Sequence, residues 1–158
     1  MTIRAADPGN KPLIRFNGDK PDNMVTIADG GELKIENIAF DGVLEPGKAL
    51  AKAGISTAFD MIQPYTLTVD GCEFQNFGEG GFFAIKGTKA TFAKSVTIRN
   101  CFFRDLSGDA INYAAEKDDI GRYNADDMLI ENCSFYRLLG LPINIYRCLL
   151  YTSPSPRD

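Results

Sequence analysis

The chain has 158 residues, which is enough for one ordinary domain, and its 15 glycines and 8 prolines predict many turns. Its formal net charge of −4 argues against nucleic acid or an anionic membrane as a partner. The absence of histidine excludes histidine-based acid–base catalysis and histidine metal sites. We find no apolar run long enough to span a membrane, and the sequence at Met1 does not predict a signal peptide.

The N-terminal part predicts three short strands separated by turns. We expect the strands at Thr2–Arg4, Leu13–Phe16 and Val25–Ile27. Asp7-Pro8-Gly9-Asn10 is a turn cluster between the first two. Three short strands with their turns would form about one coil of a solenoid.

An eight-residue unit then occurs four times, with the pattern apolar-x-apolar-x-(Asn/Gly)-(Cys/Ile)-x-Phe. The four copies are Leu33–Phe40, Leu67–Phe74, Val96–Phe103 and Met128–Phe135. The fifth positions, Asn37, Gly71, Asn100 and Asn132, are 34, 29 and 32 residues apart. A period of this length predicts stacked structural units.

A second, smaller motif follows each of the last three copies. Its copies, Phe83–Gly87, Asp109–Tyr113 and Leu141–Ile145, align on Ile85, Ile111 and Ile143. A turn that contains glycine precedes each copy. Every coil therefore carries at least two strands in a fixed order.

Two insertions interrupt the repeats, and a tail that does not belong to the repeats follows them. The first lies near residues 41–57, where Lys48–Ala53 predicts a brief helix or a loop, followed by a strand near Ala58–Ile62. The second, near residues 114–126, is rich in charge. The last eleven residues, 148–158, resemble the translation of a sequencing adapter, so we expect the β-rich domain to cover residues 1–147.

The alternation within each copy predicts the fold. Val96 and Ile98 point to one face of a strand, while Thr97 and Arg99 point to the other. One such strand cannot bury its apolar face alone, whereas stacked copies bury a continuous core. We therefore predict an all-β fold, a right-handed parallel β-helix fragment of about four to five coils, with an open C-terminal end.

Three columns of equivalent residues support this fold. The Asn/Gly positions fall where the strand must bend, and both residue types accept a left-handed backbone. The last residues of the copies, Phe40, Phe74, Phe103 and Phe135, should stack inside. Cys72, Cys101 and Cys133 form a third column, which we interpret as buried thiols because three stacked cysteines cannot all pair and lack the spacing of a zinc site.

These units resemble a known family. The segments 95–111 and 129–135 resemble coils of pectin-lyase-like parallel β-helices. Residues 2–9 resemble the opening coil of the chondroitinase B and alginate lyase family, and the likeness extends to uncharacterised secreted bacterial β-helix repeats. The resemblance implies a secreted or cell-surface protein and a polysaccharide partner. Members of the lyase family use calcium, a lysine base and an arginine, so calcium is a possible cofactor, although no matching calcium ligands can be assigned here.

The candidate binding site is a polar column formed by Lys86, Asn112 and Asn144. Each residue follows an aligned isoleucine and should point outward if that isoleucine points inward. Tyr113 and Tyr146 lie nearby in sequence and could stack on sugar rings while the amides bind hydroxyl groups. The alternative is an ordinary solvated sheet face.

The candidate catalytic residues are Lys86, as a base, and Arg122, from the second insertion, as the partner of a uronate carboxylate. The pairs Asp118-Asp119 and Asp126-Asp127 could bind calcium but lack an EF-hand spacing, so no metal site is predicted.

The predicted function is an extracellular, lyase-like module that acts on a uronic-acid polysaccharide by β-elimination. The alternative is a non-catalytic carbohydrate-binding, adhesion or spacer repeat.

Overall fold

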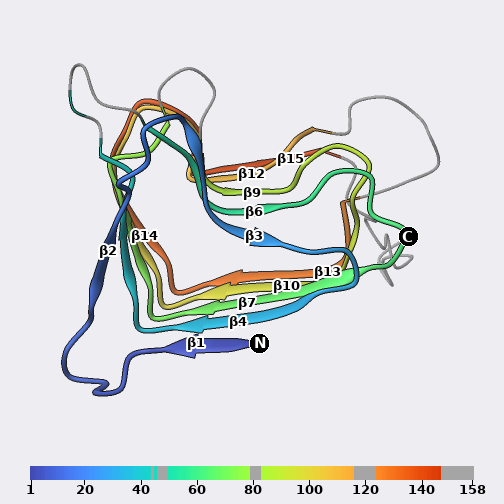
Figure 1. Cartoon of the computed structure of the whole chain (residues 1–158), viewed down its shortest axis with the longest axis horizontal. Coiled ribbons are helices and arrows are strands. Elements are labelled where there is room, and N and C mark those ends of the chain that lie inside the picture. The colour runs from blue at the N-terminus through green and yellow to red at the C-terminus, as the bar shows by residue number, and fades with distance from the viewer. Residues whose placement is uncertain (44, 46–49, 79–82, 116–123, 147–158) are drawn as a thin grey trace, which may run out of the picture.

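The computed structural model describes residues 1–43, 45, 50–78, 83–115 and 124–146. Within these residues the chain forms fifteen strands and no helix, arranged as three parallel five-stranded sheets (Figure 1). No helix of this part could cross a membrane. The predicted all-β parallel β-helix is confirmed.

Each coil contributes one strand to each sheet. Sheet A contains β1 (Thr2–Arg4), β4 (Glu32–Glu36), β7 (Tyr65–Asp70), β10 (Ala93–Arg99) and β13 (Ala125–Glu131). Sheet B contains β2 (Leu13–Arg15), β5 (Ala39–Asp41), β8 (Glu73–Gln75), β11 (Phe102–Leu106) and β14 (Ser134–Leu138). Sheet C contains β3 (Asp22–Ile27), β6 (Ala51–Thr57), β9 (Phe83–Lys86), β12 (Ile111–Tyr113) and β15 (Ile143–Ile145). Sheets A and C lie on opposite sides of the coil, and sheet B joins them (Figure 1).

The core follows the repeat. In sheet A, Ile98 pairs with Val69 on one side and Ile130 on the other. At the sheet B corner, the rings of the four repeat phenylalanines stack with centroids 5.1–5.2 Å apart and interplanar angles of 8–12°. The apolar faces of all three sheets therefore share one interior, as the alternation predicted.

The bends after β4, β7, β10 and β13 have a left-handed backbone, as predicted. The φ angles of Asn37, Gly71, Asn100 and Asn132 are 55°, 64°, 54° and 49°. Asn132 Nδ2 donates to Asn100 Oδ1 at 2.6 Å, whereas Asn100 Nδ2 donates to Asp70 Oδ1 at 2.9 Å. The amide ladder is interrupted at Gly71 because glycine has no side-chain amide, and a Cβ at this position would lie 2.4 Å from Asn37 Oδ1.

The cysteine column consists of free thiols at Cys72, Cys101 and Cys133. The Cys101 Sγ lies 3.1 Å from the Arg99 carbonyl oxygen. Contact with the Cys72 thiol, together with burial, raises the pKa of Cys101. This thiol therefore stays protonated near neutral pH and acts as a small packing group.

The strand of the first insertion lies earlier than predicted. Ala51–Ala53 belong to β6, not to a brief helix, and residues 58–62 form a bend with a φ of 52° at Asp60. β6 pairs in parallel with β3 and β9, and these inter-strand hydrogen bonds outweigh the helix propensity of the alanine and lysine residues. Residues 46–49 and the predicted adapter-derived tail, 148–158, lie outside the described residues.

Candidate functional site

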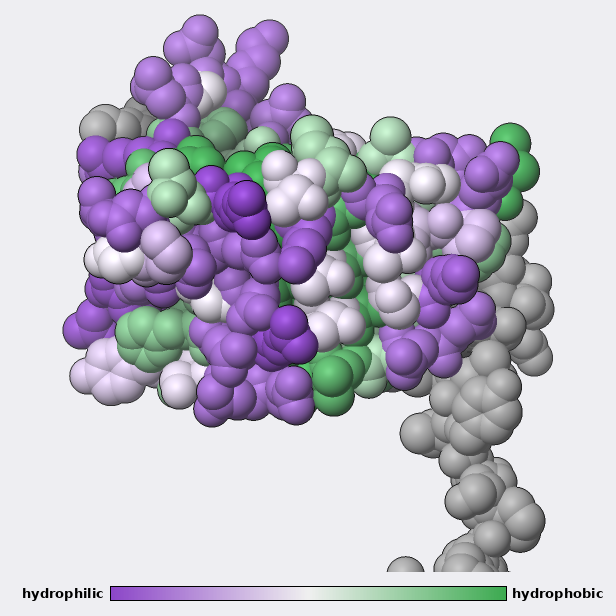
Figure 2. Space-filling model, turned by 90° about the horizontal axis from the view of Figure 1, so that it is seen from below, coloured by the Kyte–Doolittle hydropathy of each residue, from purple (hydrophilic) through white to green (hydrophobic). Residues whose placement is uncertain are grey.

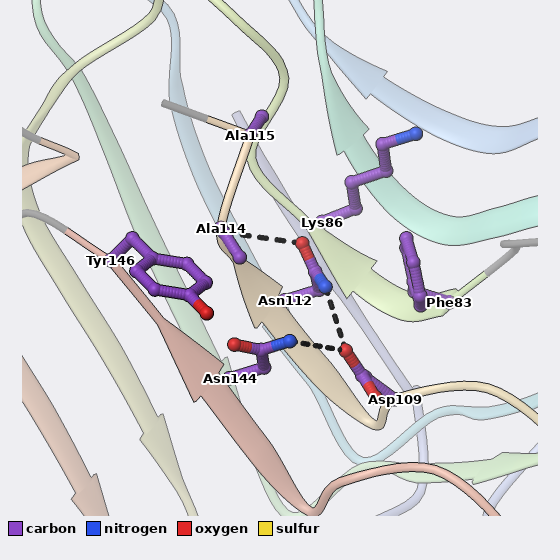
Figure 3. Close-up of a pocket in the computed structure, with 8 residues that line it drawn as sticks. All are labelled: Phe83, Lys86, Asp109, Asn112, Ala114, Ala115, Asn144 and Tyr146. Atoms are coloured by element: carbon purple, nitrogen blue, oxygen red, sulfur yellow. Dashed lines mark hydrogen bonds between the residues drawn. The ribbon is translucent and has the colours of Figure 1, made fainter. Parts of the chain in front are cut away.

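The polar column faces outward on sheet C, as predicted. Ile111 pairs with Ile85 and Ile143, and Asn112 pairs with Lys86 and Asn144. The three polar residues line one pocket of about 450 Å³ together with Phe83, Asp109, Ala114, Ala115 and Tyr146 (Figure 3). The register of three successive coils therefore builds the pocket.

Asp109, in the turn before β12, joins the polar groups of this pocket. Its Oδ2 accepts hydrogen bonds from Asn112 Nδ2 at 2.8 Å and Asn144 Nδ2 at 2.9 Å (Figure 3). Its Oδ1 accepts one from the Leu141 backbone N–H at 2.8 Å. Burial opposes ionisation of Asp109, but these three hydrogen bonds outweigh it and lower the pKa. We call Asp109, Asn112 and Asn144 the pocket floor.

Asn112 is held at both ends of its side chain. It is only 7% exposed, and its Oδ1 accepts a hydrogen bond from the Ala114 N–H at 3.2 Å. Further along, the buried Asn124 donates to the carbonyl oxygens of Tyr113 and Tyr146 and so ties the ends of β12 and β15 together. These contacts give the floor and the adjoining Tyr146 a fixed backbone.

Lys86 lies on β9 at the edge of the pocket and is half-buried. Its Nζ sits 5.6 Å from the centroid of the Phe83 ring. Desolvation, and secondarily the charge of Lys52, lower the pKa of Lys86. Within the described part of the chain its ammonium forms no ion pair. It is therefore more easily deprotonated than an ordinary surface lysine.

Two aromatic rings flank the floor on opposite sides, Phe83 beside Lys86 and Tyr146 beside Asn144 (Figure 3). The Tyr146 side chain is 50% exposed and can contact a ligand. The prediction for Tyr113 is wrong, because this residue is 1% exposed and points into the core. Tyr113 is two residues after the inward-facing Ile111 and shares its side of the strand, and burial raises its pKa to about 12.

The predicted partner of Lys86 is not placed. Arg122, Asp118 and Asp119 lie outside the described residues, while Asp126 and Asp127 are exposed on β13. Among the described residues, no group of three or more carboxylate or thiol side chains could hold a metal ion. The sequence also did not predict Asp109 as a site residue, although Asp109 is the first residue of the copy Asp109–Tyr113 of the second motif.

The outer face of sheet A differs from this pocket. Viewed from that side, the surface is mainly hydrophilic, with paler side chains between the polar ones (Figure 2). Its central register places Lys34, Thr68 and Thr97 side by side. On this sheet Lys34 is paired with Glu36 at 2.7 Å, and Arg99 with Asp70 at 2.8 Å. These charges are already paired, as on an ordinary solvated face.

The three parallel sheets define a parallel β-helix with a polysaccharide-lyase-like fold. The family described as Domain of unknown function (DUF4957) matches residues 1–118, and the chain belongs to this family. A structure of a mutant of the PL6 family alginate lyase AlyGC is similar, with a TM-score of 0.74 and 25% identity, over 92% of this chain. The chain spans only 20% of that lyase. No curated protein matches.

Proposed function

We propose that the pocket on sheet C binds a uronic-acid-containing polysaccharide and that the protein is a lyase-like module acting on it by β-elimination. The pocket itself carries the proposal, because it combines amides, a carboxylate, a lysine of lowered pKa and flanking rings. Carbohydrate sites use such polar groups to orient hydroxyls and such rings to cover the sugar faces. Since the similar solved structure is an alginate lyase, alginate is the first polymer to test.

In this proposal Lys86 is the base. Its neutral amine removes the proton at C5 of a uronate, the electron pair forms the C4–C5 double bond, and the C4–O bond breaks. The departing sugar oxygen takes up a proton from the Lys86 ammonium or from water, which restores the neutral amine or leaves it to be restored by solvent. The lowered pKa of Lys86 favours the neutral amine that this step needs. Arg122 is proposed to neutralise the carboxylate and so stabilise the charge that develops on it.

Polymers of this class lie outside the cell, so we also propose that the protein is secreted or held at the cell surface. The net charge of −4 also argues against nucleic acid as the partner. Calcium stays a proposed cofactor on the resemblance alone, since no described residues form a site for it.

One observation favours a non-catalytic function. Lys86 is the only cation among the described residues that line the pocket. A carbohydrate-binding, adhesion or spacer repeat needs the flanking rings and amides but no base. The two functions predict the same ligand and differ in whether it is cleaved.

The test is an ultraviolet absorbance assay for unsaturated uronate products, with alginate and glycosaminoglycans as substrates. We expect product from the native protein, and a rate lowered by about 10²–10⁴-fold in Lys86→Gln, because a general base contributes about that factor. Lys34→Gln is the matched control, since Lys34 lies on sheet A, and its rate should equal the native rate. Binding of the polymers without any product would overturn the catalytic proposal and support the binding one.

A further inference from the structure

The hydrogen bonds of the pocket floor fix which way its two amides face. An ionised carboxylate can only accept hydrogen bonds, so Asn112 and Asn144 must both turn their NH₂ groups toward Asp109 Oδ2. The Ala114 N–H can only donate, and it independently fixes the Asn112 oxygen on the other side. The amide orientations therefore follow from the chemistry of the partners.

The pocket floor offers a ligand mainly oxygen atoms that accept hydrogen bonds. Asn144 Oδ1 has no partner among the described residues, and Figure 3 shows it turned toward the Tyr146 side of the pocket. Asn112 is almost fully buried and offers little to a ligand. The remaining hydrogen on Asn144 Nδ2 lies beside the Asp109 carboxylate, whose negative charge disfavours an anion there. A sugar hydroxyl can donate to this floor, whereas a sugar carboxylate cannot.

The positive charge lies elsewhere in the pocket. Lys86 extends away from Asp109 in Figure 3, and its ammonium lies by Phe83. The pocket is therefore divided into an acceptor floor and a flank formed by Phe83 and Lys86, which is cationic while Lys86 is protonated. An acidic sugar has both kinds of group, and it satisfies both regions when its hydroxyls face the floor and its carboxylate faces the flank.

We infer that Asp109 sets the ligand preference of this pocket, so that the floor binds sugar hydroxyls and the sugar carboxylate is held against the Lys86 flank. This inference rests on the proposed polysaccharide function and deepens it by assigning one chemical group of the sugar to each region. Asp109 is a positioning residue for Asn144 as well as a direct acceptor.

The test uses an alginate tetrasaccharide and its carboxyl-reduced, neutral counterpart as probes. Their Kd values are measured by calorimetry at a pH low enough to keep Lys86 protonated, which stops the proposed cleavage, and the ultraviolet absorbance of the same samples shows whether the ligand stays intact. In Asp109→Asn the Leu141 N–H keeps the remaining oxygen as its acceptor, so the new NH₂ group faces the NH₂ groups of Asn112 and Asn144. The Asn144 amide must then turn, and it presents hydrogen-bond donors to the ligand. We expect the ratio of acidic to neutral affinity to rise by roughly 10- to 100-fold, the range for a hydrogen bond to a charged group.

Asp105→Asn is the matched control. It removes the same charge on sheet B, at a φ of 57° that asparagine accepts, and should leave the ratio unchanged. Lys86→Gln should move the ratio in the opposite direction, by weakening only the acidic ligand. A ratio that stays within about twofold of the native value in folded Asp109→Asn would overturn the inference while leaving the proposed function intact.

A second variant decides the matter if Asp109→Asn does not fold. Asn144→Ala removes the free acceptor oxygen, so it should weaken both ligands to the same extent, by roughly 10-fold. Loss of the acidic ligand alone in Asn144→Ala would contradict the assignment of hydroxyls to the floor. If the native protein binds neither tetrasaccharide, the proposed function fails and this inference fails with it.

Discussion

At the scale of single residues, Lys86 and Asp109 divide the chemistry of the pocket. Lys86 is half-buried beside a ring, and desolvation together with Lys52 favours its neutral form. Asp109 accepts three hydrogen bonds that favour its charged form. The lowered pKa of Lys86 suits a base, and the lowered pKa of Asp109 suits a fixed anion. Functional sites often combine titratable groups with shifted pKa values in this way.

The Lys52 charge gives a pH test of the proposed base. A neighbouring cation lowers the pKa of a lysine, so Lys52→Gln should raise the pKa of Lys86. The base acts in its deprotonated form, so the lyase rate should rise with pH through the Lys86 pKa, and in Lys52→Gln this rise should move to higher pH. The measurement is the pH–rate profile, supported by the pH dependence of Lys86 acetylation followed by mass spectrometry.

Lys34→Gln serves as the control for this shift, because its charge is on another sheet. An unchanged acetylation profile for Lys86 in Lys52→Gln, or a shift to lower pH, would show that the two ammonium groups do not interact as described.

The polar column of the pocket could be predicted from the sequence because it repeats in register. Once Ile85, Ile111 and Ile143 are aligned, the residues that follow them must face outward together. The same alternation places Tyr113 inside, so its choice as a ligand residue failed on periodicity. Asp109 lies in a turn, where no periodicity indicates its direction, and only the three-dimensional contacts reveal its role.

At the scale of elements, the columns of equivalent residues hold the coils together. The phenylalanine stack at the sheet B corner runs through four successive coils, and a left-handed bend at asparagine or glycine follows β4, β7, β10 and β13. The sequence predicted these columns because every copy has the same spacing. It failed at β6, where a run of alanine and lysine has helix propensity but pairs with β3 and β9. Parallel pairing is non-local, and a single segment carries no signal of it.

The stack gives a stability prediction. Phe103 is fully buried between Phe74 and Phe135, so Phe103→Ala should lower the free energy of unfolding by about 3–5 kcal/mol. Phe59 is 72% exposed, and Phe59→Ala should change the free energy of unfolding by no more than about 0.5 kcal/mol. Urea denaturation followed by circular dichroism measures both changes. Equal effects of the two substitutions would mean that the stack is not part of the stable core.

At the scale of the whole molecule, the three sheets present different outer surfaces. The faces of sheets A and B carry ion pairs that link neighbouring coils, such as Arg99–Asp70 and Arg104–Glu73. Exposed pairs of this kind contribute little to stability. Sheet C instead carries a pocket with an unpaired lysine and two flanking rings. Among the three sheets, sheet C is therefore the one on which we propose the polysaccharide site.

The repeat architecture also explains how a short chain can carry such a site. Each coil contacts only its neighbours, so three coils suffice to build the pocket from β9, β12 and β15. This chain spans 20% of the similar alginate lyase, yet its pocket is formed within its own described residues.

The most direct measurement is a crystal structure of the protein with an alginate tetrasaccharide bound. We predict that the sugar lies on the outer face of sheet C, with a ring against Tyr146, hydroxyl groups toward Asn144 and Asp109, and a carboxylate toward Lys86. A sugar bound to the outer face of sheet A or sheet B would contradict the central claim that sheet C carries the polysaccharide site.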